Sequence, residues 1–464
     1  MAAEFTAGEI KKAVSGELVR GEAGMGSTGV STDTRRLGAG ELFVPIAGPN
    51  FDGHDFLAGA LAGGAGGCLA ERGRAPEATE GKFAIEVEDT LEALGDLAAY
   101  HRGRFDLPVV AVTGSNGKTT CKEMIGAILA EGARVLKGEG NLNNFIGLPL
   151  QVLALEAGHE RAVFEMGMNR AGEILRLAGI AAPSVGVITG VAPAHLERLG
   201  SIEAVREAKG ELLEVMGAGG VAVLPRDDLQ CRVLAERRLE QGGRVATFGL
   251  EAKNDVYATR VKMSPEGETS FLIHMGGDKV EVSLPGVGRH NVLNALAAAT
   301  AAAQLGSPLG EIVRGLESVV LPAMRLGVES FHGGAHLLND AYNANPASVR
   351  LAISTVRELK GAGRAFAILG DMKELGAYEK FAHMEIGRAA VRAGLDFLAG
   401  VGPMMRLAVN EAHRAGMPLD QADVFTTPEE AAAWANELIL PGDWVLVKGS
   451  RSMEMERAAE ALRD

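Results

Sequence analysis

A lysine between a glycine and two threonines marks the part of this sequence best suited to phosphate chemistry. Residues 111–120 read AVTGSNGKTT. The usual phosphate loop reads G-x-x-x-x-G-K-[ST]. Here only two residues separate Gly114 from Gly117, and Val112 stands where the first glycine is expected. An apolar strand pattern precedes the loop, and an amphipathic helix pattern starts near Lys118. Backbone N–H groups at such a helix N-terminus attract anions, so the sequence predicts a shortened nucleotide-binding loop.

The side chains of this loop could supply the other groups that a nucleotide needs. Lys118 offers a positive charge for the outer phosphates, and the hydroxyl of Thr119 or Thr120 can ligate Mg²⁺. For a bare GKT, an ordinary strand-to-helix turn with a surface lysine is the alternative. With a strand before and a helix after it, we predict that the nucleotide contacts Gly114, Ser115, Asn116, Gly117, Lys118, Thr119 and Thr120.

Three side chains further along could take part in the same chemistry, although each has a simpler explanation when taken alone. Glu165 ends the strand pattern RAVFEMG, where a carboxylate at the carboxyl edge of the sheet could hold Mg²⁺. A water-exposed glutamate is the alternative. His195 follows another strand end, where a capping or surface histidine is common. Lys209 lies on a predicted helix, and by itself this favours a solvated lysine.

Composition limits the class of protein. A chain of 464 residues predicts two or three domains. The net charge of −14 disfavours nucleic acid as a partner, because phosphate backbones need clustered Lys and Arg. Cys68, Cys121 and Cys231 lie far apart without C-x-x-C spacing, so neither a disulfide framework nor a zinc site is expected. We find no secretion signal and no run of about 20 apolar residues, and expect a cytoplasmic protein without membrane insertion.

The alternation of strand and helix patterns predicts the fold class. From LPVVAVTG onward, apolar strands alternate with helices, as in parallel βαβ units. Residues 255–285 read as antiparallel strands, and a second alternating series follows LPAMRLG. We therefore predict an α/β protein of three domains: a small mixed N-terminal domain (1–107), a central parallel-sheet domain with the phosphate loop (108–322), and a Rossmann-like C-terminal domain (323–464).

The order of the motifs resembles the Mur ligases, the ATP-dependent amide-forming enzymes of bacterial peptidoglycan synthesis. TGSNGKTT is followed by GNLNNFIGLP, FEMG, VAPAHLERLGS, AKGEL and GRHNVLNALAA, and then by LNDAYNANPAS, ILGDMKELG and VKGSRSMEMER. The resemblance covers nearly the whole chain. It is strongest to the activity that joins D-alanyl-D-alanine to UDP-N-acetylmuramoyl-tripeptide through an acyl phosphate. It implies ATP and Mg²⁺ as cofactors and a monomer with small-molecule substrates. A ligase that adds the third amino acid, or a P-loop switch or kinase, is the alternative.

The resemblance also implies roles for single residues. Lys118 would contact the ATP phosphates, Thr119 and Glu165 would hold one Mg²⁺, and His195 a second. Lys209 matches the lysine that becomes carbamylated and binds metal. Arg325 would reach the γ-phosphate from the third domain, although many relatives have Pro-Gly-Arg where this chain has PAMR, which puts the backbone shape of that loop in question. The implied base and ribose contacts are Asn291, Asn294, Asp340 and Tyr342.

The substrate contacts are assigned by the same resemblance. Ser31, Asp33 and the turn FDGHDF match a segment that grips UDP, although turn and capping chemistry would explain the same residues. Asn141, Asn143 and Asn144 suit a peptide or sugar, with a plain polar loop as the alternative. Lys448, Ser450 and Arg451 follow a strand and could meet the dipeptide or the phosphates. The three domains would then bind UDP-substrate, ATP and dipeptide in turn, and closure of the domains would assemble the site.

Overall fold

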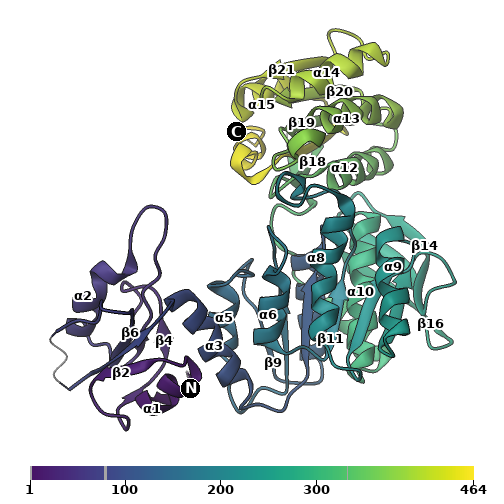
Figure 1. Ribbon diagram of the computed structural model, residues 1–464. Helices are drawn as coiled ribbons and strands as arrows, with labels where there is room; N and C mark the ends of the chain where they lie inside the picture. The colour runs from purple at the N-terminus through teal and green to yellow at the C-terminus, as the bar shows by residue number, and fades with distance from the viewer. Residues whose placement is uncertain (1–2, 78–80, 332, 464) are drawn as a thin grey trace.

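The computed structural model describes residues 3–77, 81–331 and 333–463, and each of three successive parts of the chain has its own main sheet (Figure 1). The N-terminal part lies at one side of the central part, and the C-terminal part lies above it in the view of Figure 1. The predicted fold class, α/β in three parts with parallel sheets, is confirmed. The domain borders near residues 107 and 323 stay predictions.

The N-terminal part has a five-stranded mixed sheet in the order β2-β7-β6-β5-β4, beside a two-stranded sheet of β1 and β3. The pairing of β2 with β7 is antiparallel and the others in the larger sheet are parallel. The strands are β1 (Phe5–Thr6), β2 (Glu17–Arg20), β3 (Gly26–Ser27), β4 (Val30–Ser31), β5 (Leu42–Phe43), β6 (Gly67–Glu71) and β7 (Phe83–Val87). The helices are α1 (Ala7–Ala13), η1 (Gly53–Phe56), α2 (Leu57–Ala62) and α3 (Thr90–Arg102).

The central part has a nine-stranded sheet in the order β16-β15-β14-β13-β12-β11-β8-β10-β9. Pairings from β9 to β14 are parallel, whereas β14, β15 and β16 pair antiparallel, as predicted for residues 255–285. The strands are β8 (Val109–Thr113), β9 (Val135–Lys137), β10 (Arg161–Glu165), β11 (Val185–Ile188), β12 (Val221–Pro225), β13 (Arg244–Gly249), β14 (Val256–Met263), β15 (Glu268–Met275) and β16 (Asp278–Pro285). The helices are α4 (Lys118–Ala130), α5 (Gly147–Val152), α6 (Glu173–Ala181), α7 (Leu196–Leu199), α8 (Ile202–Val215), α9 (Leu229–Glu240), α10 (Arg289–Gln304) and α11 (Leu309–Glu317).

The C-terminal part has a six-stranded sheet in the order β17-β18-β22-β19-β20-β21, parallel except for the edge strand β17. This confirms the second alternating series expected after LPAMRLG. The strands are β17 (Gly327–Phe331), β18 (Ala335–Asp340), β19 (Ala365–Gly370), β20 (Phe397–Val401), β21 (Ala422–Phe425) and β22 (Trp444–Lys448). The helices are α12 (Pro346–Leu359), η2 (Gly376–Tyr378), α13 (Glu379–Ala393), α14 (Met405–Arg414), α15 (Pro428–Asn436), η3 (Arg451–Met453) and α16 (Glu456–Ala461).

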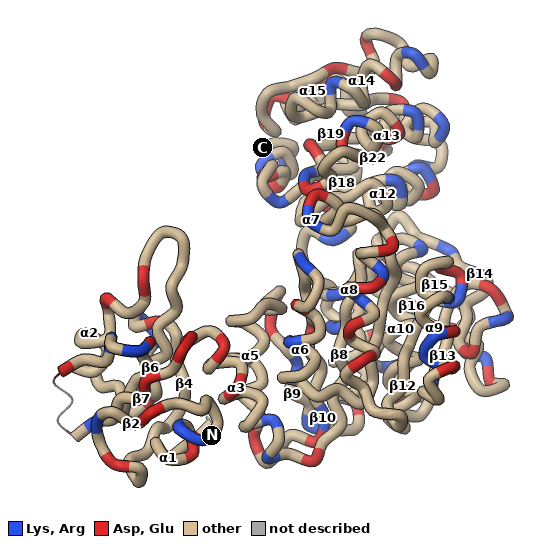
Figure 2. The backbone as a smooth tube through the Cα atoms, viewed as in Figure 1, with Lys and Arg blue, Asp and Glu red and all other residues tan. Residues whose placement is uncertain are grey.

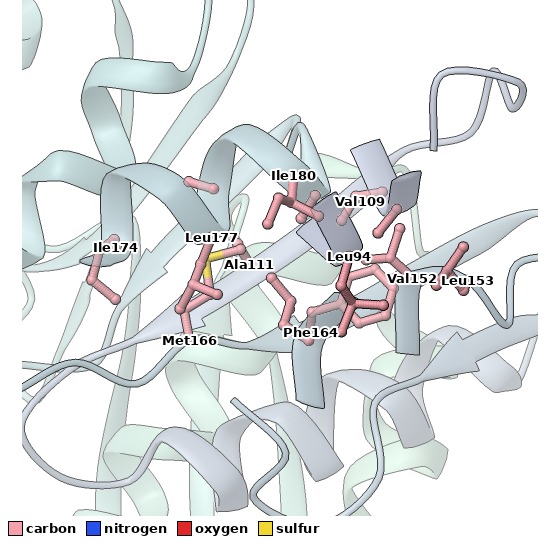
Figure 3. Packing of buried hydrophobic residues seen from close by; sticks show 14 of the residues in the cluster. Leu94, Val109, Ala111, Val152, Leu153, Phe164, Met166, Ile174, Leu177 and Ile180 are labelled. Carbon is pink, nitrogen blue, oxygen red and sulfur yellow. The ribbon is translucent and has the colours of Figure 1, made fainter. Parts of the chain in front are cut away.

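One apolar cluster runs without a break from the N-terminal part into the central sheet. Leu94 on α3 is buried with Val109 of β8 and Phe164 of β10, and helices α5 and α6 contribute Val152 and Ile180 to the same cluster (Figure 3). Because α3 packs directly on α5 and α6, apolar burial ties the N-terminal part to the central one.

The charged residues show no segregation by sign among the three parts. Figure 2 shows acidic and basic residues interspersed along the chain in all of them. The three cysteines are buried free thiols. Within the residues that the structure describes, no helix combines the length and apolar character that a bilayer crossing demands.

Candidate active site

A cleft of about 910 Å³ lies between the central and C-terminal parts, and it collects most of the residues predicted from the sequence. The central part contributes Ser115, Asn116, Gly117, Lys118, Thr119, Thr120, Asn141, Asn143, Asn144, Glu165, His195, Asn291 and Asn294 to its lining. The C-terminal part contributes Arg325, Asp340, Tyr342, Lys448, Ser450 and Arg451. Gly114, Lys209, Ser31 and Asp33 are not among the lining residues.

The two glycines of the shortened loop are required by space as well as by backbone conformation. Gly114 has φ +147° and Gly117 has φ +79°, a region that favours glycine. A Cβ on Gly114 would lie 1.9 Å from the Thr189 hydroxyl, and one on Gly117 would lie 2.1 Å from the side-chain oxygen of Asn294. The loop therefore packs tightly against the end of β11 and against α10.

The segment that follows β11 forms hydrogen bonds with the two residues between these glycines. The Ser115 N–H donates to the carbonyl of Gly190 at 2.9 Å, and its hydroxyl donates to the carbonyl of Ala192 at 2.9 Å. The Thr189 hydroxyl donates to the carbonyl of Asn116 at 2.5 Å. The segment after β11 thus holds a loop that is two residues shorter than usual. The side chain of Asn116 meets Asn345 of the C-terminal part.

Two cations from different parts of the chain meet at this loop. The Lys118 ammonium donates to the Gly114 carbonyl at 3.0 Å, and the Arg325 guanidinium donates to the Thr119 hydroxyl at 3.0 Å. Arg325 also lies over the ring of Tyr342, 4.1 Å from its centroid. Burial lowers the pKa of Lys118, with Glu165 opposing and Arg325 adding to the shift. Such a site favours an anion that can interact with both cations.

The segment before Arg325 keeps a glycine-like backbone without a glycine. Met324 has φ +57° and Leu326 has φ +59°, both in the left-handed region. The Met324 carbonyl accepts a hydrogen bond from the Tyr342 N–H at 3.2 Å. A glycine would adopt this conformation without strain. For Met324, which has a Cβ, the left-handed conformation costs about 1–2 kcal/mol of conformational free energy.

Glu165 has one carboxylate oxygen engaged and one free for a ligand. Asn143 donates from its amide to Glu165 Oε1 at 2.6 Å. Glu165 Oε2 is buried and, within the described part of the chain, has no hydrogen-bond partner. A buried carboxylate oxygen is the kind of ligand that Mg²⁺ prefers, and Thr119 lines the same cleft, so these residues fit the predicted ion. Among described residues, no group of three or more His, Cys, Asp or Glu side chains is close enough to hold a metal.

Lys209 is buried on α8, only 2% exposed, and this corrects the interpretation of it as a solvated lysine. Burial lowers its pKa well below the usual value, and the charge of Lys118 adds to the shift. Among the described residues its amine forms no hydrogen bond or ion pair. The structure therefore favours a neutral amine at this position.

His195 precedes α7 in a left-handed conformation, with φ +55°, and its side chain gives that helix no cap. Its Nδ1 lies 2.7 Å from Glu374 Oε2 of the C-terminal part. Burial lowers the pKa of His195, and Glu374 opposes the shift. The alternative of a capping histidine is therefore wrong, and the side chain instead joins the two walls of the cleft.

The nucleotide-base candidates lie where helix α10 and strand β18 face the cleft. The Asn291 amide donates to the Val287 carbonyl at 2.8 Å. Sheet register places Asp340 beside Lys448, and the two side chains form an ion pair at 2.5 Å. Burial raises the pKa of Asp340, with Lys448 opposing. His290, which the sequence analysis missed, also lines the cleft, and burial lowers its pKa to about 4.

The three asparagines of GNLNN have three different environments. Asn141 donates to the Tyr342 hydroxyl at 2.7 Å, and Asn143 contacts Glu165. Asn144 accepts from the Ile146 and Gly147 N–H groups at the start of α5. All three line the cleft, but the side-chain oxygen of Asn144 is engaged at the start of α5, which gives Asn144 the structural role of a polar loop residue.

Lys122, for which the sequence predicts no role, binds the backbone just before these asparagines. Its ammonium donates to the Gly138 carbonyl at 2.6 Å and the Gly140 carbonyl at 2.9 Å, and it lies 2.9 Å from Glu123 Oε1. These three acceptors match the three N–H donors of a lysine. Its spacing from Lys118 places it one turn further along α4. The carbonyls that it meets come from a later loop, so no local sequence pattern indicates them.

The candidates for UDP binding lie in the N-terminal part, outside the cleft lining. Asp33 accepts from Arg35 at 2.9 and 2.7 Å, which lowers the pKa of its carboxyl to about 2. The Ser31 hydroxyl accepts from the Asp33 N–H at 3.3 Å. In the FDGHDF turn, Asp52 accepts from the His54 N–H at 2.9 Å. These are turn contacts, and a role toward UDP stays a prediction.

Comparison with known proteins gives the class of this chain. The Mur ligase family, catalytic domain, matches residues 27–102; the Mur ligase middle domain matches 112–302; and the Mur ligase, glutamate ligase domain, matches 324–451. The chain belongs to the Mur ligase family, and the predicted class, an ATP-dependent ligase that forms amide bonds, is confirmed.

Within this family, the similarity extends along the whole chain to one kind of ligase. The chain is 37% identical to the UDP-N-acetylmuramoyl-tripeptide–D-alanyl-D-alanine ligase of Bacillus subtilis, over 94% of this chain and 93% of that protein. It superposes on a crystal structure of MurF from Acinetobacter baumannii with a TM-score of 0.91 and 32% identity, covering 100% and 99% of the two chains. It also superposes on the MurF ligase of Thermotoga maritima in complex with ADP, with a TM-score of 0.82 and 30% identity over 94% and 96%.

The left-handed conformation of Met324 gives a first prediction. Met324→Val should lower kcat/KM for ATP about tenfold or more, because a β-branched residue resists this conformation and would displace Arg325. Met324→Gly, the matched control, should stay within about threefold of the parent protein. Initial-rate assays over a range of ATP concentrations measure both. Equal losses in the two variants would show that the backbone conformation does not matter.

The carbonyl contacts of Lys122 give a second prediction. Lys122→Met should lower the free energy of unfolding by about 1–3 kcal/mol and speed amide hydrogen exchange over residues 138–146. The control is Lys137→Met, because Lys137 contacts Glu123 but not the loop carbonyls. Urea unfolding and hydrogen exchange followed by mass spectrometry measure these effects. Unchanged exchange in Lys122→Met would remove the proposed hold on the loop.

Proposed function

We propose that this chain joins D-alanyl-D-alanine to UDP-N-acetylmuramoyl-tripeptide with the use of ATP, making the UDP-N-acetylmuramoyl-pentapeptide precursor of peptidoglycan. The observation that carries the proposal is the cleft in which Lys118 of the central part and Arg325 of the C-terminal part meet at one loop. The similarity to ligases of this activity, at 37% identity over 94% of the chain, supports the choice of substrates.

ATP would lie along the cleft from the phosphate loop to α10 and β18. The backbone N–H groups of residues 114–120 and the ammonium of Lys118 would bind the phosphates. Arg325 would reach the γ-phosphate from the opposite wall. Asn291 and Asn294 would contact adenine, and Asp340 and Tyr342 would contact the ribose and base. Two cations aimed at the transferred phosphoryl group stabilise the charge that develops on it.

Magnesium fits the oxygen ligands at the end of β10 and the start of α4. Thr119 and Glu165 would hold one Mg²⁺, for which the unpartnered Glu165 Oε2 is suited. His195 and a carbamylated Lys209 would hold a second. When bound, such ions neutralise negative charge on the phosphoryl oxygens. Asn143 orients the Glu165 carboxylate for this role through the hydrogen bond from its amide.

The surroundings of Lys209 support its carbamylation. Burial lowers the pKa of the Lys209 amine and so favours its neutral form, which carries a free lone pair. That lone pair can attack carbon dioxide, forming an N–C bond and releasing one proton. The resulting carbamate is an anion, and the charge of Lys118 that disfavours an ammonium group there would favour it.

The residues of the chain would then perform two positioning tasks. In the first step the terminal carboxylate of the tripeptide attacks the γ-phosphate, and ADP leaves. In the second the amine of D-alanyl-D-alanine attacks the acyl carbon, and the tetrahedral intermediate expels phosphate. Asn141 and Asn143 would orient the tripeptide, and Lys448, Ser450 and Arg451 would orient the dipeptide. Closing the two walls of the cleft excludes the water that would hydrolyse the acyl phosphate.

Several sequence predictions accompany this proposal as expectations. Ser31, Asp33 and the FDGHDF turn would bind the UDP group on the N-terminal part. We expect a monomer in the cytoplasm that uses neither nucleic acid nor a membrane. The borders at 107 and 323 would separate UDP-substrate, ATP and dipeptide domains. A ligase that adds the third residue would differ in the amine that it accepts, and a P-loop switch would need no amine.

An omission assay tests the function. Protein, Mg²⁺ and ATP are mixed with UDP-N-acetylmuramoyl-tripeptide and D-alanyl-D-alanine, and one component is left out at a time. Phosphate release should require both co-substrates, and mass spectrometry should find the pentapeptide product. Release without either co-substrate would instead identify a nucleotide switch. In the same assay Lys118→Ala should lose at least about 100-fold in kcat/KM, whereas Lys262→Ala on the exposed face of β14 should not. Near-normal turnover by folded Lys118→Ala would refute its role.

The carbamate is tested without turnover. Protein equilibrated with ¹³C-labelled bicarbonate near pH 8 should show a carbamate carbon resonance that is missing in Lys209→Ala. Mild acid should remove the resonance reversibly, because protonated carbamates lose carbon dioxide. An unmodified amine across this pH range would remove Lys209 from the metal ligands.

A further inference from the structure

One short hydrogen bond joins the phosphate loop directly to the C-terminal part. The Asn345 amide donates to Asn116 Oδ1 at 2.7 Å, and the reverse contact, from Asn116 Nδ2 to Asn345 Oδ1, is 3.5 Å. Asn116 is one of the two residues between the glycines of the loop, and Asn345 immediately precedes α12. Both side chains line the cleft. Asn116 is a predicted nucleotide contact, whereas Asn345 has no predicted role.

A helix cap fixes the direction of the Asn345 side chain. Its Oδ1 accepts from the Ser348 N–H at 2.9 Å, and the Ser348 hydroxyl accepts from the Asn345 N–H at 3.0 Å, which completes a capping box. Because Oδ1 is engaged at the helix N-terminus, Nδ2 points outward to Asn116. The amide cannot turn away without losing a capping bond.

The partner is equally fixed on the other side of the cleft. The Asn116 carbonyl accepts from the Thr189 hydroxyl, and the next residue, Gly117, packs against Asn294. Two short side chains on two fixed backbones can bond only at one spacing of the central and C-terminal parts. The side-chain contacts of Arg325 and Glu374 across the cleft use longer side chains that tolerate more movement. A backbone bond from the Glu197 N–H to the Glu374 carbonyl, at 3.2 Å, also joins the two parts, away from the phosphate loop.

We infer that Asn345 is a positioning residue that sets the C-terminal part against the phosphate loop, so that Arg325 reaches its place beside Thr119. The inference rests on the proposed function, in which both walls bind one ATP. Without the amide pair, fewer molecules have the two walls at the binding distance, and the apparent affinity for ATP falls by that fraction. The loss of one such hydrogen bond corresponds to roughly a three- to tenfold change.

Two variants separate this contact from the helix cap. Asn345→Ser keeps a good N-cap residue but cannot reach Asn116, and Asn116→Ala removes the other partner. Thr427→Ala is the matched control, because Thr427 caps α15 through the same capping box in the same part of the chain. Calorimetric titration of the full-length protein with a non-hydrolysable ATP analogue and Mg²⁺ gives Kd, and steady-state assays give kcat and KM for ATP.

We expect each single variant to raise Kd three- to tenfold. The Kd of the double variant should be within about twofold of the higher of the two single-variant Kd values, because both substitutions remove the same contact. Thr427→Ala should lower Tm and leave Kd unchanged. An unchanged Kd in Asn345→Ser, or multiplied effects in the double variant, would overturn the inference. Failure of the omission assay with normal analogue binding would overturn the proposed function and leave this contact standing.

Discussion

Lys118 and Arg325 carry the same charge, and two different parts of the chain hold them at the same loop. Arg325 lowers the pKa of Lys118, which is the sign of repulsion between them. The arrangement is maintained by contacts that each cation makes separately: the Gly114 carbonyl for Lys118, and Thr119 and the Tyr342 ring for Arg325. A polyanion that entered the cleft would relieve this repulsion. Under the proposed function, binding of the ATP phosphates would therefore favour the arrangement in which both cations face the loop.

The contrast between two buried lysines shows how packing decides chemistry. Lys122 and Lys209 both lie on helices of the central part and are almost fully buried. Lys122 meets two carbonyls and a carboxylate, which satisfy a charged ammonium and make it a support for the loop. Lys209 meets no such acceptor in the described structure and has a strongly lowered pKa. The Lys122 ammonium therefore has acceptors for its N–H donors, whereas burial favours the neutral amine of Lys209.

The sequence predicts features that depend on a local residue pattern. It does not predict features that depend on contacts between residues far apart in the sequence. The start of α4 at Lys118 and the end of β10 at Glu165 follow from strand and helix periodicity, which the structure confirms. The burial of Lys209 does not, because its surroundings come from other elements. The pairing of Asn116 with Asn345 joins residues 229 positions apart. An Asn before a proline indicates a helix start, yet no sequence pattern shows what lies opposite.

The two interfaces of the central part differ in the kind of contact that forms them. Toward the N-terminal part, Leu94, Val109 and Phe164 belong to one apolar core, and sliding such an interface would open cavities. Toward the C-terminal part, the described contacts are mainly hydrogen bonds and ion pairs, with few apolar residues such as Val287 beside Leu326 and Leu338. Hydrogen bonds across an interface can be replaced by hydrogen bonds to water at a small cost in free energy. The interface with the N-terminal part therefore resists movement more than the interface with the C-terminal part. A force applied to the two ends of the chain should detach the C-terminal part first.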